Sequence, residues 1–319
     1  MEYLEHIGQI AYTVVAPLVV LAGAGYLLGR RVEAAADVLA KTLLYLLIPV
    51  FVFRNILDSD LAGAEYGRII AFSAAALAVF YVLAQVASRV RGQDRPLRGA
   101  FTNSVILYNS ANFGIPVMAL AFSFGEEQQT YAVAVQIIVA ACQGTAAYTV
   151  GALLAAAGSG GVGRAARQVL RLPFIYALAA ALAMKTAGLD ADVLRRVPLL
   201  WKPLSIISEA YVAMALLTLG SQMARVRLAH VPLDLVMSAG LRLLIGPLVG
   251  LGLVAVLGLE GLLAQILVIG ISGPSAVAGA VVAIEFRNRP DFAARAVMLS
   301  TLAAGVTVPT VIFAVQRLF

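Results

Sequence analysis

The sequence predicts an all-α integral membrane protein with ten transmembrane helices, which form two inverted repeats of five and include broken helices 4 and 9. Three observations predict this class. Hydrophobic residues make up 61% of the 319 residues and charged residues only 13%, whereas soluble domains carry about 25% charged residues. Apolar runs long enough to cross a bilayer recur along the chain. A glycine-rich segment divides these runs into two sets of five, and one run in each set is interrupted near its middle.

Spans 1 to 3 are predicted at 7–28, 36–57 and 66–88, because each is an apolar run of about 20 residues followed by a charged loop. The first run follows Glu2 and Glu5 and is not followed by a small-residue cleavage site. We therefore interpret it as a transmembrane helix rather than as a signal peptide.

Proline, glycine or charged residues border most of the remaining apolar runs, and these residue types typically end a helix or a membrane span. The fourth run follows Pro96, and the charged stretch from Arg287 to Asp291 separates the last two runs. Spans 4 to 10 are predicted at 97–124, 129–157, 172–188, 201–223, 233–258, 261–286 and 293–317.

The distribution of positive charge predicts the orientation of the chain. Fifteen Lys and Arg residues fall in one alternate set of loops and seven in the other. Because cytoplasmic loops are enriched in these residues, we expect a multi-pass protein of the inner (plasma) membrane with both termini outside the cytoplasm. The net charge of +6 would suit nucleic acid in a soluble protein, but here the arginines cluster between spans, so we predict no nucleic-acid partner.

The longest hydrophilic stretch divides the chain into two repeats. We assign 1–157 to the first five-helix repeat, 158–171 to a cytoplasmic linker and 172–319 to the second repeat. Because five is odd, two similarly folded halves must cross the membrane with opposite polarity, as in many secondary transporters.

The fourth span of each repeat contains residues that interrupt a helix. The first interruption runs from Asn109 to Pro116 and the second from Ser272 to Ser275. Proline removes a backbone donor and glycine permits unusual dihedral angles, so the helix should unwind at both places. We expect the second half-helices to begin at Gly114 to Pro116 and at Pro274 to Ala276, and their N-termini to attract a carboxylate.

Residues in both halves are similar to those of a known family. Asn109 to Pro116 resemble the Asn-x-x-x-x-Gly-x-Pro stretch of the auxin efflux carrier family, which includes the plant auxin exporters and many bacterial carriers. The resemblance covers essentially the whole chain, which is identified as a bacterial-type member. The other similar segments are Ser208 to Ala210, Ala215, Leu219-Gly220, Pro274, Glu285-Phe286, Ala296 to Leu302 and Val308-Pro309.

The resemblance implies an inverted-repeat fold of the bile-acid-transporter type, in which spans 4 and 9 cross at their breaks. Spans 3–5 and 8–10 would form a mobile transport domain, and spans 1, 2, 6 and 7 a scaffold that often forms a homodimer. An elevator-like displacement would expose the site alternately to each side. The resemblance also places the family's substrate-contacting asparagine at Asn109.

Polar residues near the breaks are candidates for substrate binding. Several of them have a structural alternative. Asn112 could cap a half-helix, Gln136 and Gln143 could form hydrogen bonds between helices, and Ser275 could act as a local cap. The complete candidate set is Asn109, Asn112, Gly114, Pro116, Gln136, Gln143, Gly273, Pro274 and Ser275.

Two charged residues inside the spans have competing interpretations. Glu209 could carry a proton during transport, or it could pair with a cation or lie at the scaffold interface. Arg242 in span 8 could hold an anion, but its position favours snorkelling toward the cytoplasmic surface.

These features predict a secondary transporter for a small organic anion, such as a mono- or dicarboxylate or an auxin-like acid. We expect no cofactor and no metal site, because Cys142 is the only cysteine and no nucleotide-binding motif is present. The alternatives are a membrane sensor or receptor, a channel-like protein and, least favoured, an intramembrane enzyme, since the spans lack a recognisable catalytic set.

Overall fold

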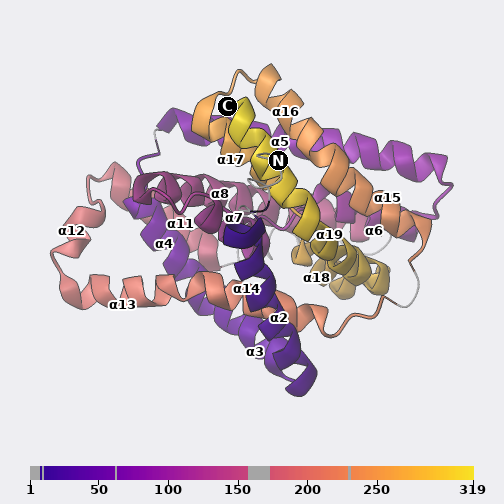
Figure 1. The fold of residues 1–319 in the computed structure, drawn as a ribbon, viewed down its shortest axis with the longest axis horizontal. Helices are drawn as coiled ribbons and strands as arrows, with labels where there is room; N and C mark the ends of the chain where they lie inside the picture. The colour runs from indigo at the N-terminus through magenta and orange to yellow at the C-terminus, as the bar shows by residue number, and fades with distance from the viewer. Residues whose placement is uncertain (1–7, 9–10, 62, 157–172, 229–230) are drawn as a thin grey trace.

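The structure is a computed structural model that describes residues 8, 11–61, 63–156, 173–228 and 231–319. The described residues are folded almost entirely into helices, and no described segment forms a strand longer than an isolated bridge (Figure 1). The predicted linker 158–171 lies outside the described residues. All ten predicted apolar runs contain helix, so the all-helical prediction is confirmed for the described part of the chain.

Seven helical segments among the described residues are long and apolar enough to cross a membrane, and this finding supports a multi-pass membrane protein. They are Tyr12–Arg31, Ala35–Asp58, Gly63–Val90, Glu126–Ala155, Pro198–Met223, Leu233–Val256 and Pro290–Leu318. The other three predicted spans correspond to the shorter apolar helices Ser110–Ala121, Pro173–Thr186 and Gly261–Ile271. Two of these three belong to the interrupted spans, where the break itself shortens the helix.

Short π-helical turns (η) interrupt several of the long helices. The elements before residue 157 are η1 Ala11–Val15, α2 Ala16–Arg31, α3 Ala35–Thr42, η2 Leu43–Leu47, α4 Ile48–Asp58, α5 Gly63–Val90, α6 Arg95–Ile106, η3 Ser110–Gly114, α7 Ile115–Ala121, α8 Glu126–Ala146, η4 Ala147–Gly151 and α9 Ala152–Ala155. The elements after residue 172 are α11 Pro173–Thr186, α12 Ala191–Arg195, α13 Pro198–Glu209, α14 Tyr211–Met223, α15 Leu233–Gly240, η5 Leu241–Ile245, α16 Gly246–Val256, α17 Gly261–Ile271, α18 Val277–Glu285 and α19 Pro290–Leu318.

We call α2, α3, α4, α11, α13 and α14 the scaffold helices, because they contain the predicted spans 1, 2, 6 and 7. We call α5 to α9 and α15 to α19 the transport helices. In Figure 1, α2, α3, α13 and α14 lie in the lower part of the view, whereas α5, α15 and α16 lie in the upper right. These members of the two groups therefore lie in different parts of the view, whereas the scaffold helices α4 and α11 lie beside the transport helix α8.

Glycines bring two scaffold helices into backbone contact. Gly25 and Gly29 of α2 are four residues apart and face α14, and a Cβ on Gly29 would lie 2.7 Å from the carbonyl oxygen of Ser221. Gly220 of α14 packs in the same way against the backbone of Ala22. Small residues at this spacing let membrane helices approach closely and gain van der Waals contact. The α2–α14 pair therefore forms a tightly packed centre of the scaffold.

Ion pairs join separate elements within each group of helices. Such exposed pairs are typically worth 0 to about 1 kcal/mol each, so they supplement the packing rather than replace it. Asp94 also caps α6, because its side chain accepts a hydrogen bond from the Leu97 N–H. This bond and the ion pair with Arg289 lower the pKa of Asp94. The pairs are Arg91–Asp234 and Arg289–Asp94 in the transport helices, and Arg225–Asp37 and Arg195–Asp58 in the scaffold.

Candidate substrate-binding site

The two interrupted spans meet at their breaks. Tyr108 and Ser275 form an isolated antiparallel bridge. The Asn109 N–H donates to the Pro274 carbonyl and the Ala276 N–H donates to the Leu107 carbonyl, each at 2.8 Å. Each unwound segment thus satisfies backbone groups of the other, which is required at membrane depth because a free backbone group there costs several kcal/mol. We call this hydrogen-bonded meeting point the crossover.

A cavity of about 220 Å³ borders the crossover, between the scaffold and the transport helices. Its wall is mostly apolar, with a polar border formed by the first break. Among the described residues that line it, none carries a charge. The polar and aromatic residues that line the cavity are Phe51, Tyr108, Asn109, Ser110, Asn112, Gln143, Tyr148, Phe174, Tyr211, Thr218 and Gln222.

Asn109 directly precedes the second half-helix of span 4, and its side chain is 5% exposed. Its Nδ2 atom has no hydrogen-bond partner. The neighbouring Tyr108 is 1% exposed, and its hydroxyl is also without a partner. Because an unmade buried hydrogen bond costs about 1–3 kcal/mol, these two donors, on residues that line the cavity, are suited to a ligand that accepts hydrogen bonds.

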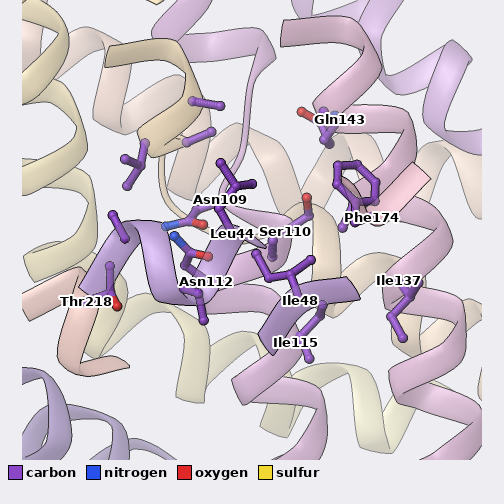
Figure 2. Close-up of a pocket in the computed structure, with 18 of the residues that line it drawn as sticks. Leu44, Ile48, Asn109, Ser110, Asn112, Ile115, Ile137, Gln143, Phe174 and Thr218 are labelled. Atoms are coloured by element: carbon purple, nitrogen blue, oxygen red, sulfur yellow. The ribbon is translucent and has the colours of Figure 1, made fainter. Parts of the chain in front are cut away.

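Asn112 lies one turn further along and is half-buried. Figure 2 shows the amides of Asn109 and Asn112 on the same border of the cavity, beside the start of the half-helix at Ser110. The first N–H groups of a helix have no partner within it and carry a partial positive charge. This border therefore combines amide donors with the positive end of a helix.

The helix after the first break begins earlier than the sequence predicts. We expected it to start at Gly114 to Pro116, but the helical run is continuous from Ser110. The π-helical turn η3, in which the Gly114 N–H bonds the Asn109 carbonyl, precedes Pro116 in the first turn of α7. A proline in a first helical turn interrupts no required hydrogen bond, so the break lies at Leu107 to Asn109. Gly114 and Pro116 are buried and do not line the cavity.

Gln136 lies between the two broken spans and is fully buried. Its Nε2 donates to the Ser110 carbonyl at 2.9 Å. Gly114 and Gly270 leave the space that this side chain fills, since a Cβ on Gly270 would lie 2.6 Å from its Oε1. Gln136 is absent from the cavity wall, and its contacts agree with the helix-joining alternative.

Gln143 reaches the cavity seven residues later on α8. Its Oε1 accepts from the Tyr108 N–H at 3.2 Å, which satisfies a backbone donor at the break. In Figure 2 it borders the cavity near Phe174. Gln143 therefore combines a structural bond with a position at the cavity wall.

The polar groups of the second break are paired within the protein. Ser275 is 1% exposed, its hydroxyl donates to the Ser104 carbonyl at 2.7 Å, and its N–H donates to the Ser300 hydroxyl at 3.0 Å. The predicted candidates Gly273, Pro274 and Ser275 are all buried and do not line the cavity. The half-helix α18 begins at Val277, directly after the predicted start.

Glu209 is the last residue of α13 and lies on the exposed surface of the scaffold, away from the cavity wall. Its assignment to proton coupling stays a prediction.

Arg242 corrects a second expectation. We expected it to snorkel toward the cytoplasmic surface, but it is fully buried. Its guanidinium donates to the Val105 carbonyl at 2.6 Å and to the Ile271 carbonyl at 2.5 Å. These carbonyls belong to the ends of α6 and α17, so the arginine is held at the crossover and cannot extend to water.

Several lining residues were missed by the sequence interpretation. Ser110 belongs to the interrupted segment from Asn109 to Pro116, so its polar side chain beside the break was a recognisable signal. Thr218 and Gln222 are polar residues four apart in an apolar span, which is a recognisable signal for a shared inward face. The aromatic residues Tyr148 and Tyr211 give no such signal, because their positions depend on how distant helices pack.

Sequence comparisons support a membrane transporter. The profile of a family described as "Membrane transport protein" matches residues 164–312. An uncharacterized transporter of Methanothermobacter thermautotrophicus is 28% identical over 297 residues, which cover 92% of this chain and 94% of that protein. Both matches support a membrane transport family, and they point to transport rather than to catalysis.

Proposed function

We propose that this chain is a secondary carrier that moves a small organic anion through the membrane, and that the anion binds at the first break beside Asn109. The single observation that carries the proposal is that Asn109 and Tyr108, two residues that line the crossover cavity, each have a buried donor without a hydrogen-bond partner, Nδ2 and Oη. A carboxylate would accept from these donors while it faces the positive end of the half-helix that begins at Ser110.

The cavity wall favours an amphipathic anion. Its aromatic residues, including Phe51, Phe174 and Tyr211, can pack against an apolar body, whereas the donors cluster on one border. A dicarboxylate would need a second cluster of donors to replace the hydration of its second charge. We therefore favour a monocarboxylate with an apolar or aromatic body, such as an auxin-like acid, over a dicarboxylate.

We propose ten membrane spans in two inverted repeats and an elevator-type alternating access, consistent with the resemblance to auxin efflux carriers. The location of the cavity between the two groups of helices supports this mechanism, because a sliding transport group would carry the first break past the scaffold wall. Among the described residues, one hydrogen bond across this boundary joins the Tyr211 hydroxyl to the Ala111 carbonyl at 3.3 Å. A single neutral bond of this kind is worth only about 0.5–1.5 kcal/mol, so its loss would not prevent sliding.

With the orientation predicted from positive charge, the cavity lining extends to Tyr148 and Gln222 near the cytoplasmic ends of their helices. This position suits loading from the cytoplasm, and we propose efflux across the inner (plasma) membrane. We also propose that the scaffold forms a homodimer within the lipid bilayer.

A thermal-shift screen of the purified full chain against small organic anions tests the proposal. A ligand that binds only the folded state raises the unfolding midpoint in proportion to occupancy. We expect aromatic monocarboxylates such as indole-3-acetate to give larger shifts than malate or malonate, and we expect Asn109→Ala to require roughly tenfold to a hundredfold more anion for the same shift. Shifts that need no more anion in folded Asn109→Ala protein than in wild type would remove the first break from the site.

The screen must be followed by a flux measurement, because binding alone also fits a sensor or receptor. Saturable flux of the bound anion would support a carrier. Binding without any flux would favour the sensor, and flux that does not saturate would favour a channel-like protein.

A further inference from the structure

Arg242 places a positive charge in the middle of the predicted membrane. It lies in η5, nine residues after the start of α15 at Leu233, which corresponds to roughly 14 Å along a helix. Half of a hydrocarbon core is about 15 Å. A cation at this depth is costly unless the protein replaces its hydration, so the contacts of Arg242 must compensate for that cost.

Those contacts come from the C-terminal ends of both interrupted helices. The guanidinium donates to Val105 at the end of α6 and to Ile271 at the end of α17. It also lies over the rings of Phe80 and Tyr108, 3.9 Å and 4.9 Å from their centroids. Among the described residues, no carboxylate forms an ion pair with it.

Gly246 leaves the space that the guanidinium occupies. It follows Arg242 by one turn, and a Cβ there would lie 3.3 Å from the Nη2 atom of Arg242. The surrounding helices therefore pack closely around the guanidinium group of Arg242.

The C-terminal end of a half-helix is where transporters with broken helices coordinate a coupling cation, because its free carbonyls carry a partial negative charge. In this chain both such ends already face the same guanidinium. We propose that Arg242 is a built-in cation that takes the place of a coupling ion, so that the carrier moves its anion without co-transported Na⁺. This inference rests on the proposed function and adds the ion requirement of the same site.

The built-in charge has a consequence for the electrical behaviour of the carrier. Arg242 lies over the ring of Tyr108, and Tyr108 also lines the cavity. A bound monovalent anion would therefore bring the net charge of the crossover to zero. The loaded transport helices would then move no net charge, whereas the empty ones would move one positive charge. Net efflux should therefore respond to membrane potential, and one-for-one exchange of the anion should not.

Replacement of the cation in the buffer tests the proposal without any mutation. The anion-induced thermal shift and the flux of wild-type protein are measured in Na⁺, K⁺ or N-methylglucamine at equal ionic strength. We expect the anion affinity and the flux to agree within about twofold among the three cations. A tenfold or larger requirement for Na⁺ or K⁺ would overturn the proposal.

Chemical rescue tests the residue itself. We expect Arg242→Ala to lower the thermal midpoint and to lose the anion-induced shift, and we expect low millimolar guanidinium to restore both where Na⁺ does not. The matched control is Arg289→Ala, which removes an exposed arginine from the transport helices and should respond to neither cation. Wild-type anion binding by Arg242→Ala without guanidinium would contradict the proposal.

If Arg242→Ala does not fold, Arg242→Lys provides the same test because it keeps the charge. It should retain the anion-induced shift with an affinity within about tenfold of wild type. A folded Arg242→Lys protein that binds no anion in any cation would overturn the built-in-cation proposal.

The outcomes separate this inference from the proposed function. If guanidinium restores the midpoint of Arg242→Ala but no organic anion binds wild-type protein, the carrier proposal fails and the cation site stands. If anions bind and move only with Na⁺, the carrier proposal stands and the role of Arg242 fails.

Discussion

The two breaks form one hydrogen-bonded crossover, but they leave their polar groups in different states. At the first break, Asn109 Nδ2 and the Tyr108 hydroxyl have no hydrogen-bond partner, and both residues line the cavity. At the second break, Ser275 is bonded to Ser104 and Ser300. Similar interruptions in sequence can therefore serve different purposes, and we infer that the first break binds substrate while the second holds the crossover together.

The largest effect on binding is expected for Asn109→Ala. A hydrogen bond to a charged group contributes about 1.5–3 kcal/mol, so the affinity for the anion should fall roughly tenfold to a hundredfold with little change in the midpoint of the empty protein. Titration of the thermal shift measures both quantities.

Asn103→Ala is the matched control, because its amide is already bonded to the Gly151 carbonyl within the transport helices. It should cost stability and leave affinity nearly unchanged. If the two asparagine variants lose affinity equally, the loss does not report contact with the anion.

Ser275→Ala is expected to show the reverse pattern. It leaves the buried Ser104 carbonyl without this partner, which should lower the free energy of unfolding by about 1–3 kcal/mol and change affinity by less than about threefold. Ser272→Ala is the control in the same break, since its hydroxyl bonds only the Val268 carbonyl one turn back. A loss of affinity in Ser275→Ala as large as in Asn109→Ala would erase the distinction between the breaks.

Asn112→Ala should have a smaller effect than Asn109→Ala. Asn112 is only half-buried and can be replaced in part by water, so a neutral contribution of about 0.5–1.5 kcal/mol is expected. Affinity should fall about twofold to tenfold in the same titration. An effect larger than that of Asn109→Ala would move the centre of the site one turn along the helix.

The smallest effect is expected for Pro116→Ala. Pro116 lies in the first turn of α7 and not at the break, so both affinity and flux should change by less than about twofold. The flux assay decides this prediction, because a large loss of turnover at unchanged affinity would show that the π-helical turn before Pro116 acts as a hinge.

The sequence was sufficient for the features that depend on local signals. Apolar length predicted helix in all ten runs, and glycine, proline and polar residues marked the two segments where helices are interrupted. The importance of Asn109 followed from its place beside a break and from family resemblance. The predicted break was placed too late in the chain, because Pro116 suggested a helix start. In the structure η3 precedes Pro116, and the helical run already begins at Ser110.

The remaining features depend on contacts between distant parts of the chain. Arg242 bonds carbonyls that are 137 and 29 residues away in sequence, and its neighbourhood in sequence gives no sign of them. The position of Gln136 between Gly114 and Gly270 is of the same kind. Sequence therefore located the polar residues, but packing decided which of them reach the cavity.

Counterflow in proteoliposomes tests the central claim most directly. Vesicles that contain the full chain are loaded with an excess of the anion found in the thermal-shift screen, and a trace of labelled anion is added outside. We predict transient accumulation of label with wild-type protein and with Ser275→Ala protein, and none with Asn109→Ala protein. Accumulation with Asn109→Ala equal to that of wild type, or no accumulation with wild type, would contradict the account.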